Sequence, residues 1–215
     1  MADRILAKEF KDLAQEKWVH IQLDNDNIYN WDVALIVLNP DSLYYGGYFK
    51  ASMTFPENYP YSPPEFRFLR PLYHPNIYED GRLCISILHT PGEDITSGES
   101  AAERWSPAQR VETVLISILS LLDDAEVSSP ANVEAGLTLR RDPATYECIV
   151  MACVEASKED IPDGFIMPDS TPKPSADNDD FFADSDEDED VFGGSDSSTG
   201  EEMADGDDDD DEEIF

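Results

Sequence analysis

The chain has 215 residues and carries 48 acidic side chains against 14 Lys and Arg, which gives a formal net charge of −34. This length suits one ordinary domain with a tail, and it is too short for two large domains joined by a linker. Phosphate backbones and anionic lipid headgroups repel so acidic a chain, so direct binding to nucleic acid or to a membrane is disfavoured. No apolar run in the sequence reaches the roughly 18 residues of a membrane span.

The acidic excess is concentrated at the C-terminal end of the sequence. Residues 168–215 contain 21 acids and one base, Lys173, and therefore carry −20 of the −34. Few apolar side chains are available there to offset the entropy cost of ordering, so we expect a disordered acidic tail behind a folded domain of residues 1–167. Such a tail favours a basic protein surface as its partner. Isolated aromatic residues interrupt it and are candidate partner-binding residues: Phe181, Phe182, Phe192 and Phe215.

The chain contains three cysteines, Cys84, Cys148 and Cys153, with no Cys-x-x-Cys pair. This pattern argues against a disulfide framework and against a zinc site, so we expect no metal. We expect no cofactor either. Reduced thiols are typical of a protein of the cytoplasm or nucleus. Cys148 and Cys153 fall within an apolar helical stretch, where small buried side chains are the expected interpretation.

Apolar residues at helical spacing predict a first helix over residues 3–17. Its polar positions include the basic side chains Arg4, Lys8, Lys11 and Lys17. Four short strand-like runs follow, separated by turn-forming Asn, Asp, Gly and Pro residues. These runs cover residues 19–23, 31–37, 48–54 and 65–69. Short connections between consecutive strands are typical of an antiparallel meander.

Each remaining helix is expected to follow a Ser-Pro or Asp-Pro pair. Ser106-Pro107 has the character of a helix N-cap and first helical residue, and the apolar stripe after it predicts a crossing helix buried against the sheet. Ser129-Pro130 predicts a short helix near 131–138, and Asp142-Pro143 predicts a longer one near 143–158. The sequence thus predicts an α/β fold of the α+β kind, with an N-terminal helix, a four-stranded antiparallel sheet, a crossing helix and two C-terminal helices.

Residues 72–105 lack any periodic pattern, and an irregular stretch of this length inside a compact domain is typically functional. It contains His74-Pro75-Asn76 and, eight residues after Asn76, Cys84, the only cysteine outside a predicted helix. A cysteine nucleophile needs a neighbouring base, and His74 and His89 are both available by sequence. These residues alone are compatible with a catalytic Cys84 and with a purely structural one.

Several motifs occur together in an order and spacing that resemble the ubiquitin-conjugating enzyme family. They are Asn58–Pro64, Tyr73–Ile77, Cys84, Trp105–Ala108 and Ser129–Asn132, within a match over residues 3 to about 158. The resemblance implies that Cys84 accepts ubiquitin as a thioester from an activating enzyme and passes it to lysine side chains with a RING-type ligase. It also implies that ATP is used by the activating enzyme and is not bound here.

Two departures from the family pattern lie near Cys84. Cys84 and Trp105 are 21 residues apart, where short members of the family have far fewer, so an insert occupies roughly residues 89–104. Its acids are expected to support catalysis: Glu93, Asp94, Glu99 and Glu103. An acidic insert with an acidic tail resembles the cell-division-cycle type that works with cullin-RING (SCF) ligases. Ser129 stands where many members have an Asp that helps to orient and deprotonate the lysine, and helix N-capping is its alternative role.

The resemblance also implies roles for residues before Cys84. Asn76 is similar to an oxyanion-stabilising amide of the family, while its alternative role is to hold the loop that precedes Cys84. For His74 we favour a turn-pinning role over proton transfer. We expect Tyr78, together with His74, to be among the residues that support catalysis.

Two partner surfaces follow from the resemblance. The basic residues Arg4, Lys8 and Lys11 are similar to the face that meets the activating enzyme, although a solvated helix face also explains them. The RING domain is expected to meet four loop residues, Pro60, Tyr61, Pro107 and Ala108. The expected partners are therefore ubiquitin, the activating enzyme and a cullin-based RING ligase. Two alternatives stay open: an enzyme for another ubiquitin-like modifier, and a non-catalytic ubiquitin-binding relative.

Overall fold

The computed structural model describes residues 2–90 and 102–168. All of them belong to one compact unit. Several predicted site residues lie outside the described residues: Glu93, Asp94, Glu99, Phe181, Phe182, Phe192 and Phe215. The boundary predicted at 167/168 and the function of these residues therefore stay predictions.

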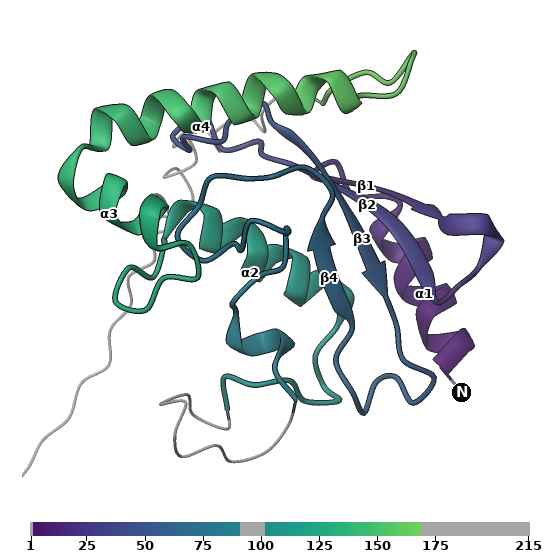
Figure 1. Cartoon of the computed structure of the whole chain (residues 1–215). Helices are drawn as coiled ribbons and strands as arrows, with labels where there is room; N and C mark the ends of the chain where they lie inside the picture. Colours follow the sequence, from purple (N-terminus) through teal and green to yellow (C-terminus); the bar gives the residue numbers. More distant parts are fainter. Residues whose placement is uncertain (1, 91–101, 169–215) are drawn as a thin grey trace, which may run out of the picture. The chain divides into compact units, whose positions relative to one another are not determined.

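The sheet is the predicted antiparallel meander, with strand order β1-β2-β3-β4 (Figure 1). Its strands are β1 (Val19–Leu23), β2 (Asn30–Ile36), β3 (Tyr48–Thr54) and β4 (Glu65–Phe68). The register pairs Ile21 with Val33 and Val33 with Ala51. All four predicted strands are present, and their ends differ from the prediction by one residue or less.

The helices are α1 (Ala2–Leu13), α2 (Val111–Asp123), α3 (Val133–Arg141) and α4 (Pro143–Ser157). α1 ends four residues before the predicted end, where its apolar periodicity stops. α4 begins as predicted, since the Asp142 side chain accepts a hydrogen bond from the Thr145 backbone N–H at 3.1 Å and Pro143 is the first helical residue. The four helices and the sheet confirm the predicted fold class.

The predicted start of α2 at Ser106-Pro107 is wrong. Residues 106–109 form a turn, in which the Gln109 N–H donates to the Ser106 carbonyl at 2.9 Å, and the helix begins at Val111. Arg110 is extended and acts as the N-cap, and its N–H donates to the Thr113 hydroxyl at 2.9 Å. A carboxylate from α1, that of Glu9, accepts from the Val111 N–H at 2.7 Å. A tertiary contact therefore replaces the local Ser cap.

The predicted start of α3 is also wrong. Asn132, and not Ser129, is the N-cap, because its side chain accepts from the Ala135 N–H at 3.0 Å. The helix therefore begins at Val133. Ser129 and Pro130 belong to the loop that precedes it, so N-capping does not explain Ser129.

The two faces of the sheet bury different sets of residues, because side chains alternate along a strand. Trp31, Val33 and Leu35 of β2 point into the main core, which the apolar faces of the helices also enter. The intervening residues, Ala34 and Ile36, point to the opposite face. There they pack with Tyr48, and Leu38, Ile161, Phe165 and Met167 lie against this smaller cluster.

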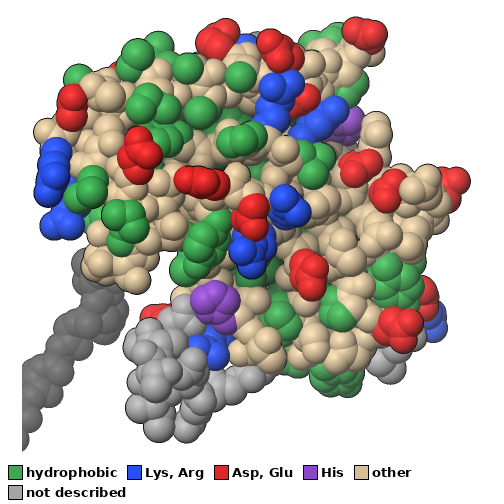
Figure 2. All heavy atoms as spheres, in the orientation of Figure 1, with side chains coloured by type: hydrophobic (Ala, Val, Ile, Leu, Met, Phe, Trp, Pro, Cys, Tyr) green, Lys and Arg blue, Asp and Glu red, His purple; other side chains and the backbone are tan. Residues whose placement is uncertain are grey.

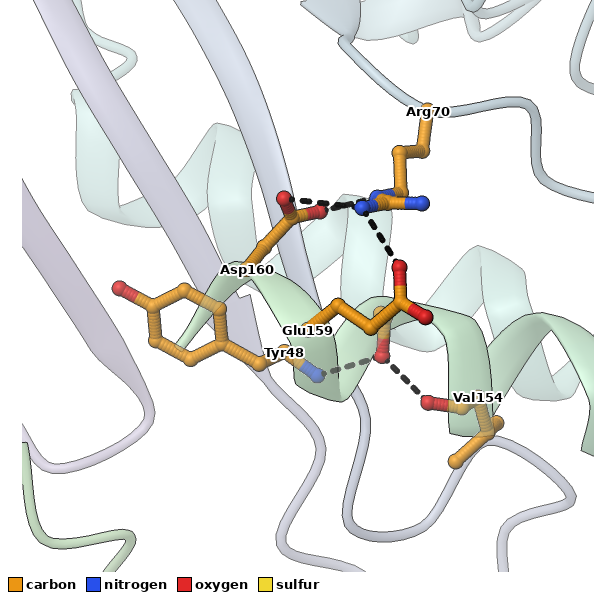
Figure 3. Close-up of polar contacts among 6 residues, drawn as sticks. Tyr48, Arg70, Val154, Glu159 and Asp160 are labelled. Atoms are coloured by element: carbon orange, nitrogen blue, oxygen red, sulfur yellow. Dashed lines mark hydrogen bonds and ion pairs between the residues drawn. The ribbon is translucent and has the colours of Figure 1, made fainter. Parts of the chain in front are cut away.

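The end of α4 is fastened to the sheet by polar contacts (Figure 3). The Tyr48 N–H donates to the Ser157 hydroxyl at 3.1 Å, and that hydroxyl donates to the Val154 carbonyl at 2.7 Å. Arg70, just beyond β4, pairs with Glu159 at 3.2 Å and with Asp160. These contacts fix the point at which the chain leaves the helix and returns over the sheet.

Candidate active site

Cys84 lies in a segment held by backbone contacts at both ends. A bridge pairs Ile77 with Leu83, and the Cys84 N–H donates to the Asn76 carbonyl at 2.9 Å. The turn before it requires glycine: Gly81 has φ of 86°, and a Cβ there would lie 2.1 Å from the Phe68 carbonyl oxygen. The Cys84 thiol is partly exposed and forms no disulfide. Backbone geometry, rather than local helix or strand propensity, therefore positions the thiol.

His74 is fully buried and uses both ring nitrogens. Its Nε2–H donates to the Leu121 carbonyl at 2.9 Å, and its Nδ1 accepts from the Asn76 N–H at 3.0 Å. Burial lowers the pKa of His74 to about 4, so the ring is neutral at physiological pH. The ring joins the loop before Cys84 to the end of α2, which supports the turn-pinning role over proton transfer.

The pH dependence of stability tests this role of His74. Its pKa falls from an ordinary 6.5 to about 4 on folding, so the unfolded state binds a proton that the folded state excludes. The contribution to stability is complete above pH 6.5 and is lost as the pH falls towards 4, by about 3 kcal/mol at most.

We therefore expect His74→Asn, although less stable at pH 7, to lose less further stability between pH 6.5 and 4 than the unsubstituted protein. Urea unfolding at a series of pH values measures this difference. His20→Asn is the comparison variant. Burial also lowers the pKa of His20, although this residue is only partly buried. If the free energy of unfolding of His74→Asn fell with pH as steeply as that of the unsubstituted protein, the assignment of a buried, neutral His74 would be contradicted.

Asn76 joins the two loops that flank the thiol. Its Oδ1 accepts from the Glu126 N–H at 2.8 Å, and its Nδ2 donates to the Glu126 carbonyl at 2.9 Å. Because the Asn76 carbonyl also binds the Cys84 N–H, one residue ties the backbone of Cys84 to the backbone of Glu126. The structure thus shows the loop-holding role of Asn76, and the oxyanion role stays a prediction.

Cys84 opens into a cleft of about 960 Å³. Three further residues of interest line it: Asn76, Ser129 and Glu126. The rest of the lining comes from residues 85–86, 88–90, 103–104, Leu121 and Ser128. Of the predicted insert acids, Glu103 is described, and it is exposed and lines the cleft. The structure therefore brings together Cys84, Asn76, Ser129 and Glu103, and it adds Glu126.

Tyr78 lies outside the cleft that contains Cys84. It lines a separate depression with Arg82, Asn132 and Glu134, and the Arg82 guanidinium sits 5.4 Å from the centre of its ring. The Tyr78 N–H donates to the Arg82 carbonyl at 2.9 Å. These contacts stabilise the turn before Cys84, and Tyr78 does not line the cleft.

Among the described residues, the predicted partner residues are exposed except Pro60, which is half-buried. Arg4, Lys8 and Lys11 are exposed on α1, and Tyr61 is 64% exposed. Pro107 and Ala108 are exposed in the turn before α2. The indole N–H of buried Trp105 donates to the Pro60 carbonyl at 2.8 Å. This bond joins the two loops that the resemblance assigns to the RING domain.

Glu9 is a structural residue that the sequence did not reveal. It is 8% exposed, accepts from the Tyr59 hydroxyl at 3.0 Å and accepts from the Val111 N–H at 2.7 Å. Burial raises the pKa of this carboxyl. Glu9 connects α1 to the Tyr59–Tyr61 loop and to α2, but in the sequence it looks like one more polar residue of an amphipathic helix.

Of the other two cysteines, one differs from expectation. Cys148 is exposed, so its prediction as a buried apolar residue is wrong, while Cys153 is partly buried and packs against the core. Cys148 lies on the outward face of α4 with Met151, which is 57% exposed. Figure 2 shows that hydrophobic side chains gather over this helix. Cys148 is therefore an accessible thiol and the natural control for Cys84.

Within residues 2–90 and 102–168, no group of three or more His, Cys, Asp or Glu side chains is arranged to hold a metal ion. In the same residues, no helix is long and apolar enough to cross a bilayer.

Comparisons with known proteins agree with the motifs. A sequence model of the ubiquitin-conjugating enzyme family matches residues 5–154. A Saccharomyces cerevisiae protein, ubiquitin-conjugating enzyme E2-34 kDa, is 52% identical over 174 residues, which are 79% of this chain. This chain covers 59% of that yeast relative's length. An Arabidopsis thaliana relative, ubiquitin-conjugating enzyme E2 7, is 45% identical over 161 residues, which are 74% of this chain and 96% of the relative.

A solved structure shares the fold. The E2 domain of a Toxoplasma gondii ubiquitin-conjugating enzyme superposes with a TM-score of 0.62 at 26% identity, covering 73% of this chain and 98% of that one. The family model spans the sheet, α2, α3 and most of α1 and α4, with Cys84 and Asn76 inside it. The chain belongs to the ubiquitin-conjugating enzyme family.

Proposed function

We propose that the protein accepts ubiquitin as a thioester on Cys84 and transfers it to lysine side chains of substrates or of ubiquitin. The observation that carries the proposal is the position of Cys84, a partly exposed thiol held by its backbone at the edge of a large cleft. In the first step the Cys84 thiolate attacks the carbonyl carbon of the ubiquitin thioester on the activating enzyme. The thiolate of that enzyme leaves, so one C–S bond replaces another.

In the second step the neutral amine of a lysine attacks the same carbonyl carbon. The tetrahedral intermediate collapses to an amide, the Cys84 thiolate leaves, and the proton from the amine passes to solvent or to a base. An asparagine amide has two N–H groups, and the Glu126 carbonyl occupies one on Asn76. The other is the proposed donor to the oxyanion, a role of roughly 3–4 kcal/mol in comparable sites.

Ser129 and the insert acids are the proposed neighbours of the acceptor. Ser129 is exposed, lines the cleft and does not cap α3. Glu103 lines the same cleft, while Glu93, Asp94 and Glu99 enter the proposal from the sequence alone. A carboxylate near a lysine must orient the amine or take its proton, because its charge by itself raises the pKa of the lysine.

A charging assay tests the proposed function and its two alternatives. The protein is incubated with ubiquitin-activating enzyme, ATP and ubiquitin and is analysed on a non-reducing gel, where a reducible adduct is expected. A non-catalytic relative would form none. A parallel incubation with another ubiquitin-like modifier and its own activating enzyme distinguishes an enzyme for that modifier, since only the cognate pair should charge Cys84.

We further propose that a cullin-based RING ligase is the partner in transfer and that the protein works in the cytoplasm and nucleus. Exposure of Tyr61, Pro107 and Ala108 on loops joined through Trp105 supports a RING-binding surface. The −20 charge of residues 168–215 supports a basic groove on the ligase as a second contact. Opposite long-range fields can raise association rates to about 10⁸–10⁹ M⁻¹s⁻¹, with a steep dependence on salt.

Truncation before Pro168 tests the role of the tail. We expect charging of Cys84 to be nearly unchanged and the rate of association with a cullin-RING ligase at low salt to fall by at least about tenfold. Stopped-flow binding at several salt concentrations measures the rate. Full-length protein with the tail aromatics replaced by Ala should retain the association rate and dissociate faster. Equal rates and equal salt dependence for the full-length and truncated proteins would contradict the proposed contact between the tail and the ligase.

A further inference from the structure

Glu126 occupies a fixed position in the loop between α2 and α3. Both polar groups of its backbone bind the Asn76 side chain, at 2.8 and 2.9 Å, and the Asn76 carbonyl binds the Cys84 N–H at 2.9 Å. Asn76 is itself 2% exposed. The position of the Glu126 backbone relative to Cys84 is therefore set by one buried residue, without a flexible connection.

The side chain of Glu126 is also held. Its Oε1 accepts from the Ser128 N–H at 2.7 Å, and the residue is exposed and lines the cleft that contains Cys84. Hydrogen bonding from the Ser128 side chain and backbone lowers the pKa of the Glu126 carboxyl, so it is an anion at neutral pH. A carboxylate has about four acceptor sites, and the hydrogen bonds from Ser128 use about two of them.

The cleft receives a cation in the second step of the proposed reaction. A free lysine has a pKa near 10.4 and arrives almost entirely as an ammonium ion. Among the described residues that line the cleft, the acids are Glu103 and Glu126. Glu103 belongs to the predicted insert, whereas the backbone of Glu126 is fixed to Asn76. Ser129, where many members of the family have an acid, offers a hydroxyl but no charge.

We propose that Glu126 is an acceptor-binding residue, which captures the ammonium group of the incoming lysine in the cleft beside Cys84. This inference rests on the proposed function. Glu126 is a weak base because its carboxyl is held in the ionised form, so it does not remove the proton of the amine. It raises the occupancy of the cleft by lysine, and the proton leaves before attack by another route. The effect therefore belongs to binding of the acceptor, and it also lowers the share of bound lysine that is in the neutral, reactive form.

Discharge of the charged protein to free lysine tests the proposal. Glu126→Gln keeps an oxygen that accepts from Ser128 and removes only the charge. The half-saturating lysine concentration should rise about three- to fivefold, as expected for a partly exposed ion pair. The rate at saturating lysine should rise by a similar factor, because the lost charge no longer raises the pKa of the bound amine, and charging should be unchanged. Glu126→Asp should restore part of the affinity.

Two controls separate charge from structure. Hydroxylamine is an uncharged amine nucleophile at neutral pH, so its discharge of the thioester should be equal in Glu126→Gln and the unsubstituted protein. Glu147→Gln removes one charge from the exposed surface of α4, away from the cleft, and should leave the half-saturating lysine concentration unchanged. Slower discharge to both nucleophiles in Glu126→Gln would mean a structural effect and would overturn the proposal.

The outcomes also separate this proposal from the proposed function. If the unsubstituted protein forms no reducible ubiquitin adduct, the proposed function fails and the role of Glu126 fails with it. If the adduct forms normally and Glu126→Gln has the same half-saturating lysine concentration, the proposed function stands and the role of Glu126 is overturned.

Discussion

Replacing Cys84 with Ser is expected to eliminate the reducible ubiquitin adduct. A serine oxygen in the same position can at most form an ester, which resists thiol reductants, so the adduct should either survive reduction or be absent. Ubiquitin discharge to lysine should fall to the background rate. Gel analysis with and without reductant, after incubation with activating enzyme, ATP and ubiquitin, measures both results.

Cys148→Ser is the matched control, because Cys148 is the exposed thiol of α4. This variant should charge and discharge like the unsubstituted protein, and so should Cys153→Ser. A reducible adduct that persists in Cys84→Ser and disappears in Cys148→Ser would mean that Cys148 on α4 carries the thioester. That result would contradict the proposed site.

Replacing Asn76 with Ala should have the second largest effect. Transfer to lysine should slow by about 10²–10³-fold, as for loss of an oxyanion donor, with a smaller effect on charging. The variant should also be less stable, because the Glu126 N–H and carbonyl lose their hydrogen-bond partners. Each group left unsatisfied lowers the free energy of unfolding by about 1–3 kcal/mol. Single-turnover discharge and urea unfolding measure the two effects separately.

Asn132→Ala distinguishes the catalytic from the structural part of the Asn76 effect. It removes the N-cap of α3, which costs about 1 kcal/mol, and Asn132 does not line the cleft. Its discharge rate should be unchanged at a temperature where it is fully folded. If Asn76→Ala, also fully folded, transferred ubiquitin to lysine at the same rate as Asn132→Ala, the role of Asn76 would be limited to holding the loop.

Elements whose signals are local were predictable from the sequence. The strands alternate in polarity between clear turns, and α4 starts at an Asp-Pro pair whose Asp is the cap that the structure shows. The two wrong helix starts have different causes, one tertiary and one local. At α2 a distant carboxylate, that of Glu9, satisfies the first helical N–H, and at α3 an Asn three residues further on supplies the cap. A nearby Ser-Pro pair cannot reveal either contact.

The candidate site was predictable only in part for a similar reason. Family motifs identified Cys84, His74 and Asn76, but the partner of the Asn76 side chain is a backbone 50 residues further along the chain. No local pattern marks Glu126, which is one more acid in an acidic chain. The exposure of Cys148 depends on which face of α4 packs against the core, and apolar residues lie on several sides of that helix. Tertiary packing, not residue type, decides these features.

Peptide mapping of the charged protein tests the central claim most directly. After incubation with activating enzyme, ATP and ubiquitin, the adduct is digested under acidic, non-reducing conditions and the modified peptides are identified by mass spectrometry. The proposed function predicts that the C-terminal remnant of ubiquitin is attached through sulfur to Cys84 and that Cys148 and Cys153 are unmodified. A remnant on either of these two cysteines with Cys84 free, or the absence of any thioester-linked peptide, would contradict it.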